Sequence, residues 1–73
     1  MPNITVQLFP GRSVETRREL VAELTRTTCA VLGCSPAAVT VILQDVEPHN
    51  WGVGGDLFSD KLATKAASDG DAD

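Results

Sequence analysis

The residue with the greatest chemical potential is Pro2, which directly follows Met1. A start methionine before a small residue such as proline is normally removed, so we expect Pro2 to become the first residue of the mature chain. Its nitrogen would then be a free secondary amine, which no internal position can supply. Such an amine acts as a general base when its surroundings lower its pKa toward neutrality. If Met1 is retained, the same nitrogen is a tertiary amide and cannot be a base.

Other residue types that carry chemistry are sparse. Cys29 and Cys34 are too few for a disulfide framework and lack the second Cys or His pair of a zinc site, so we interpret them as small apolar fillers. The glycine-rich stretch 52–55 is not followed by the Lys-Ser/Thr pair or the long helix of a phosphate-binding loop. We interpret His49 as an exposed turn residue.

The composition predicts a small subunit that associates with other chains. A single domain of 73 residues supplies only a few kcal/mol of core stability, whereas 42% hydrophobic content is generous for a monomer of that size. The net charge of −4 and the absence of a basic face with aromatic residues argue against nucleic-acid binding. Neither a membrane-spanning run nor a signal peptide is visible, so we expect a cytoplasmic protein.

The hydrophobic pattern predicts a strand, a helix and a second strand. Residues 3–9 alternate polar and apolar, and Pro10-Gly11 ends this strand. Residues 14–32 follow a helical period between Ser13, a good N-cap, and Gly33, a plausible C-cap. The apolar helix face comprises Leu20, Val21, Leu24, Thr28, Val31 and Leu32.

A short helical turn is predicted from Ser35 to Ala38, followed by a strand over residues 39–46. This strand is apolar on nearly both faces, which predicts a place in the middle of the sheet. A strand, helix and strand in this order form a βαβ unit with parallel strands and a right-handed crossover.

The end of the chain is expected to be less regular. Residues 47–50 read as a turn, and the three glycines within 51–55 suit a tight hairpin. Residues 56–61 are expected to form a last short turn or strand. We place the folded domain at residues 2–62 and expect a disordered acidic tail over residues 63–73.

Together these features resemble the 4-oxalocrotonate tautomerase family. The resemblance rests on Pro2, on Gly11-Arg12-Ser13 at the turn from strand to helix, and on the sequence Trp51-Gly52-Val53-Gly54-Gly55. It implies an α+β fold: a small β-α-β subunit with parallel strands and a C-terminal β-hairpin. It also implies a hexamer built as a trimer of dimers, active sites at subunit contacts, and neither metal nor organic cofactor.

The resemblance further implies a reaction and its residues. Members of the family convert an enol or dienol of a 2-oxo acid, such as 2-hydroxymuconate, to its keto form. Pro2 matches the general base, and Arg12 matches the arginine that binds a substrate carboxylate from a neighbouring subunit. Trp51 stands where the family usually has phenylalanine, as an apolar wall beside the proline. Phe9 lies near the same pocket.

Thr40 departs from the family pattern. The best-studied tautomerases have a second arginine there, which binds the substrate's carbonyl oxygen and adjacent carboxylate. Thr40 offers one neutral hydrogen bond instead, and loss of a charged donor of this kind typically costs about 2 to 4 kcal/mol of transition-state stabilisation. Gln7, His49 and Asn50 are conceivable substitutes.

Two other functions are compatible with the sequence. One is a non-catalytic or partner subunit of a mixed hexamer, which Thr40 favours. The other is a dehalogenase or hydratase of the same superfamily, in which a protonated proline acts as an acid and a carboxylate activates water. Val53 lies where that carboxylate would be wanted, which disfavours the second alternative.

Overall fold

The computed structural model describes residues 1–67 and confirms the β-α-β arrangement with a C-terminal hairpin. Strand β1 covers Asn3–Leu8, helix α1 covers Val14–Leu32 and strand β2 covers Thr40–Asp45. The strands pair in parallel, with Asn3 opposite Thr40 and Leu8 opposite Asp45. Each strand is slightly shorter than its predicted range, whereas the helix bounds agree with the prediction.

Local sequence signals explain where α1 begins and ends. The Ser13 hydroxyl accepts a hydrogen bond from the Thr16 backbone N–H at 3.1 Å, as an N-cap side chain should. Gly33 ends the helix in the left-handed conformation with φ of 74°, and its N–H donates to the Cys29 carbonyl at 2.8 Å. Pro36–Ala38 then form the expected 3₁₀ turn.

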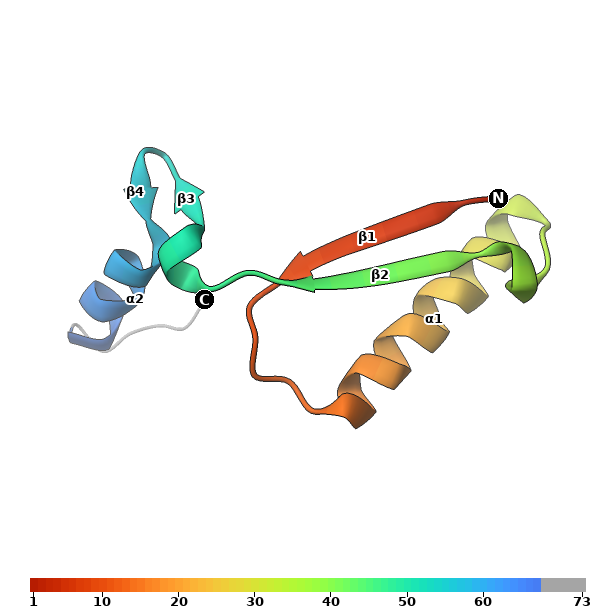
Figure 1. Ribbon diagram of the computed structural model, residues 1–73, viewed down its shortest axis with the longest axis horizontal. Helices are drawn as coiled ribbons and strands as arrows, with labels where there is room; N and C mark the ends of the chain where they lie inside the picture. The colour runs from red at the N-terminus through yellow and green to blue at the C-terminus, as the bar shows by residue number, and fades with distance from the viewer. Residues whose placement is uncertain (68–73) are drawn as a thin grey trace.

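The predicted hairpin consists of β3 (Gly52–Val53) and β4 (Asp56–Leu57), which pair antiparallel. Gly54 and Gly55 connect them with φ angles of 64° and 92°. Positive φ at both central residues defines a type I′ turn, whose twist matches that of a two-stranded ribbon. Figure 1 shows the hairpin set beyond the carboxyl ends of β1 and β2, away from α1.

The prediction for residues 56–61 was incomplete, because a second helix, α2 (Phe58–Ala67), begins directly after β4. Phe58 and Leu62 are spaced one helical turn apart and Asp60 lies in the first turn, which are helix signals in a short segment. Helix α2 continues to Ala67, five residues past the boundary expected at residue 62. Residues 68–73 lie outside the described residues.

The single chain is open and elongated. Its Cα radius of gyration is 15.9 Å, whereas a compact domain of this length has about 11 Å. None of the side chains described for residues 1–62 is buried. This subunit alone therefore lacks the core on which small domains depend. The large apolar side chains left exposed are Met1, Val14, Val31, Leu32, Ile42, Val53, Leu57 and Leu62.

Two predictions of burial were wrong for the single chain. Strand β2 is not in the middle of a sheet, because its sheet has two strands, and Ile42 on its outer face is 49% exposed. Val31 and Leu32 were assigned to the apolar face of α1, which we expected to be buried, but are 76% and 62% exposed. A helix of 19 residues is about 28 Å long and six-residue strands are about 20 Å long, so the ends of α1 overhang the sheet.

The caps provide a matched test of local stability. Replacing Ser13 by alanine removes the hydrogen bond to Thr16 and should lower the free energy of unfolding by about 1 kcal/mol. Ser35 is also an N-cap residue, but its side chain makes no cap hydrogen bond. Ser35→Ala should therefore change stability much less. Denaturant unfolding at fixed protein concentration measures both variants, and equal losses would contradict the role given to the Ser13 hydroxyl.

Candidate functional site

Pro2 and Thr40 lie side by side at one end of the two-stranded sheet. The Thr40 backbone N–H donates to the Pro2 carbonyl oxygen at 3.0 Å, which extends the parallel ladder by one rung. Pro2 is half-buried and the Thr40 side chain is exposed on the outer face of β2. The position at which the family usually has its second arginine is therefore adjacent to Pro2 in this chain.

Phe9 and Trp51 meet at the opposite end of the sheet, together with a third aromatic residue. The Phe9 and Trp51 rings pack edge to face with centroids 4.7 Å apart, and the Phe9 and Phe58 rings lie 5.0 Å apart. The Phe58 N–H also donates to the Trp51 carbonyl oxygen at 2.7 Å. Such ring pairs add to the stability gained from buried area. Phe58 was missed by the sequence analysis because α2 was not predicted.

Arg12 lies in the loop between β1 and α1, and its side chain is exposed. Its carbonyl oxygen accepts a hydrogen bond from the Arg17 Nε at 3.3 Å. The Arg17 Nη2 in turn contacts the Asp45 Oδ1 at 2.6 Å, which links α1 to the end of β2. This ion pair was also missed, because residues 28 positions apart give no local sequence signal.

One chain does not bring these residues together. Pro2 precedes β1 and Phe9 follows it, and six residues of strand separate the two ends by about 20 Å. Arg12 and Trp51 lie near the Phe9 end of the sheet, because Arg12 follows Phe9 closely in sequence and Trp51 contacts Phe9. Pro2 and Thr40 therefore form one half of the predicted site, and Arg12, Phe9 and Trp51 form another half.

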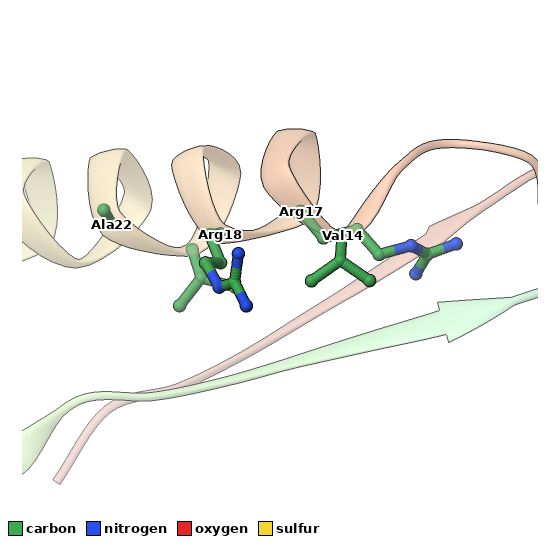
Figure 2. A pocket seen from close by; sticks show the side chains of 5 residues that line it. Val14, Arg17, Arg18 and Ala22 are labelled. Carbon is green, nitrogen blue, oxygen red and sulfur yellow. The ribbon is translucent and has the colours of Figure 1, made fainter.

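A groove of about 360 Å³ runs along the side of α1 and does not coincide with either half (Figure 2). The surface that lines this groove is almost entirely apolar, although two of its five lining residues are arginines. It contains none of the five residues predicted for the site. The residues lining it are Val14, Arg17, Arg18, Val21 and Ala22.

The two cysteines are free thiols and only partly exposed. Loss of hydration, followed by a hydrogen bond with the Cys34 thiol, raises the pKa of Cys29. A raised pKa keeps that thiol protonated and weakly nucleophilic at neutral pH. His49 lies in the exposed 3₁₀ turn Pro48–Asn50, as the sequence indicated.

The arrangement of the strands, helix and hairpin is that of a known family. A family model described as tautomerase enzyme matches residues 2–61, so that the match begins at Pro2. The chain belongs to the tautomerase family. A probable tautomerase of Ralstonia nicotianae is 42% identical over 55 residues, which cover 75% of this chain and 79% of that protein. A probable tautomerase of Dickeya dadantii is 32% identical over 62 residues, covering 84% and 92% of the two chains.

Solved structures extend this similarity to three dimensions. The crystal structure of TomN, a 4-oxalocrotonate tautomerase homologue in the tomaymycin biosynthetic pathway, is 35% identical with a TM-score of 0.81 and covers 85% of this chain and 95% of its own. A heterohexameric 4-oxalocrotonate tautomerase from Chloroflexus aurantiacus is 32% identical with a TM-score of 0.75, and the match covers 81% of this chain and 95% of that one. These similarities support a tautomerase-like isomerase.

Among the described residues, no helix has the length and apolar character that crossing a membrane requires.

Proposed function

We propose that this protein is a cofactor-independent tautomerase that converts an enol or dienol of a 2-oxo acid, such as a 2-hydroxymuconate-like compound, to its keto form. The observation that carries the proposal is the family match that starts at Pro2 and continues through the hairpin. Pro2, once Met1 is removed, acts as the general base. It takes the hydroxyl proton of the dienol and returns a proton to the carbon at the far end of the diene, which moves the remaining double bond next to the new carbonyl and gives the conjugated ketone.

Substrate binding in this proposal uses the other half of the site. Arg12 offers a planar guanidinium whose two parallel N–H groups fit a substrate carboxylate. Trp51 and Phe9 form an apolar wall that excludes water and disfavours the ammonium form of the proline. Thr40, beside Pro2, contributes a neutral hydroxyl where a charged donor is usual. This substitution favours substrates that need less charge stabilisation at their carbonyl oxygen.

The separation of the two halves supports assembly of several copies around each site. In the proposed homohexamer, a trimer of dimers, a neighbouring subunit brings Arg12 toward Pro2. The exposed apolar side chains and the absence of a buried core in the described part of the chain provide the driving force. We expect Ile42, on the outer face of β2, to be buried in such a subunit contact.

The assembly is tested by sedimentation of the purified chain. We expect a species of about six times the 7.7 kDa subunit mass. Ile42→Asp introduces a charge on the outer face of β2 and should shift the protein to smaller species, because an unpaired charge is costly to bury. A stable monomer with the wild-type sequence would refute the assembly.

A mixed hexamer is the second candidate, and Thr40 is the observation that favours it. The homologue from Chloroflexus aurantiacus is a heterohexamer, so this fold accommodates two kinds of subunit. If this chain forms smaller species alone and is inactive, a family member that carries an arginine at the Thr40 position becomes the expected partner. The dehalogenase or hydratase alternative remains less favoured, because Val53 supplies no carboxylate.

The role of Pro2 is tested with 2-hydroxymuconate on protein whose mass shows that Met1 has been removed. Pro2→Ala replaces the secondary amine by a primary amine and should lower kcat about a hundredfold or more. Pro36→Ala is the control, because Pro36 lies in an exposed turn outside the predicted site. It should leave kcat unchanged. A Pro2→Ala variant with the wild-type rate would exclude Pro2 as the base.

The role of Thr40 is tested by restoring a cation. Thr40→Arg should raise kcat for a dicarboxylate dienol about tenfold or more if the missing charge limits the reaction. Thr27→Arg adds the same charge at an exposed position of α1, away from the outer face of the sheet and outside both halves of the predicted site. It should have little effect. Equal changes in both variants would mean that overall charge, rather than a donor next to Pro2, determines the rate.

A further inference from the structure

Arg17 connects the Arg12 loop to two regular elements. It lies in the first two turns of α1, and its side chain is only 22% exposed although arginine is usually a surface residue. Its Nε donates to the Arg12 carbonyl oxygen at 3.3 Å, while its Nη2 contacts the Asp45 carboxylate at 2.6 Å. One guanidinium, carried by α1, therefore contacts both the Arg12 loop and the end of β2. Figure 2 shows Arg17 directed from α1 toward the strands.

Apart from the hydrogen bonds of the Ser13 cap, the loop has little else to hold it. Residues 10–13 form neither helix nor strand, and Gly11 has a φ of 117°, a region that side chains rarely permit. Within residues 1–67, no backbone group donates to or accepts from the Arg12 peptide groups. The contact from Arg17 is the hydrogen bond that restrains the Arg12 carbonyl. Fixing that carbonyl limits rotation of the adjoining peptide plane and thereby the direction of the Arg12 side chain.

The ion pairs of the two arginines also leave Arg12, and not Arg17, available to bind a carboxylate. The Arg12 side chain forms no ion pair with another described residue, so its guanidinium is available to an anion. The guanidinium of Arg17, in contrast, is already paired with Asp45. Arg17 consequently does not compete for a substrate carboxylate, even though it lies five residues from Arg12. A bidentate carboxylate contact depends strongly on orientation, so a fixed loop should bind better than a free one.

We propose that Arg17 is a positioning residue that, anchored by Asp45, fixes the Arg12 loop so that the Arg12 guanidinium is presented to the substrate carboxylate. This inference rests on the proposed function for the role of Arg12. It assigns to the Arg17–Asp45 ion pair an effect on substrate affinity in addition to any contribution to stability.

Two variants separate the two contacts of Arg17. Arg17→Lys keeps a positive charge near Asp45 but has no Nε to donate to the Arg12 carbonyl. Asp45→Asn leaves both arginines intact and weakens the anchor, because it removes the negative charge that pairs with Arg17. Arg26→Lys is the matched control, because Arg26 lies in the same helix, pairs with Glu23 at the surface and has a 70% exposed side chain. Sedimentation is used to check that each variant keeps the wild-type assembly.

Kinetics with 2-hydroxymuconate test the positioning. Arg17→Lys and Asp45→Asn should each raise KM about three- to tenfold with kcat within about twofold of the wild-type value, whereas Arg26→Lys should change neither. In an Arg12→Ala background, Arg17→Lys should have no further effect on KM. A merely structural role would instead lower kcat through loss of active enzyme. An undiminished effect in the Arg12→Ala background would overturn the proposal.

Hydrogen–deuterium exchange of residues 13–17, where the Thr16 and Arg17 amides bond to Ser13 at the end of the loop, provides a readout that needs no turnover. Arg17→Lys should accelerate exchange in this segment and Arg26→Lys should not. If the wild-type protein is inactive but the acceleration is present, the proposed function fails and Arg17 still fixes the loop. If Arg17→Lys exchanges and binds like Arg26→Lys, the positioning role fails, whatever the activity of the protein.

Discussion

The parallel pairing of β1 and β2 is the constraint on which the rest of this molecule depends. A parallel pair needs a crossover, and here α1 supplies it, so both strands begin at one end of the sheet and finish at the other. Pro2 and Thr40 therefore lie together at the first end. Arg12, Phe9 and Trp51 follow the second end. The topology that creates the subunit also divides its predicted site into two halves.

Because the predicted site is divided in this way, a single copy of so small a chain cannot complete it. A β-α-β unit with a two-stranded sheet covers one face of that sheet with a helix and leaves the other face open, as Ile42 illustrates. Its helix is longer than its strands, which exposes Val31 and Leu32 as well. In the proposed hexamer, the same contacts that bury these side chains would complete the site. Stability and catalysis would then depend on one set of interfaces.

The sequence predicted those features that local rules determine. The alternation of polar and apolar residues predicted β1, and the helical period of apolar residues predicted α1. Ser13 and Gly33 predicted the two ends of α1, because helix capping depends on residues that are neighbours in the sequence. Helix α2 was missed because Phe58 follows a hairpin of two-residue strands, where no periodic run is long enough to be distinctive. The Arg17–Asp45 contact could not be predicted, because it depends on how α1 crosses β2. Pro2 was named from its place after Met1, and the other site residues were named through family resemblance; periodicity alone identified none of them.

The packing of Phe9 against Trp51 has a consequence for how this protein can be observed. Trp51 is the only tryptophan in the chain and there is no tyrosine, so nearly all of its near-ultraviolet emission arises at the junction between the sheet and the hairpin. Release of the hairpin from β1 would expose the indole to water while leaving the helical circular dichroism of α1 largely intact. The chain therefore carries a built-in optical label, without chemical modification, at the end of the sheet opposite Pro2.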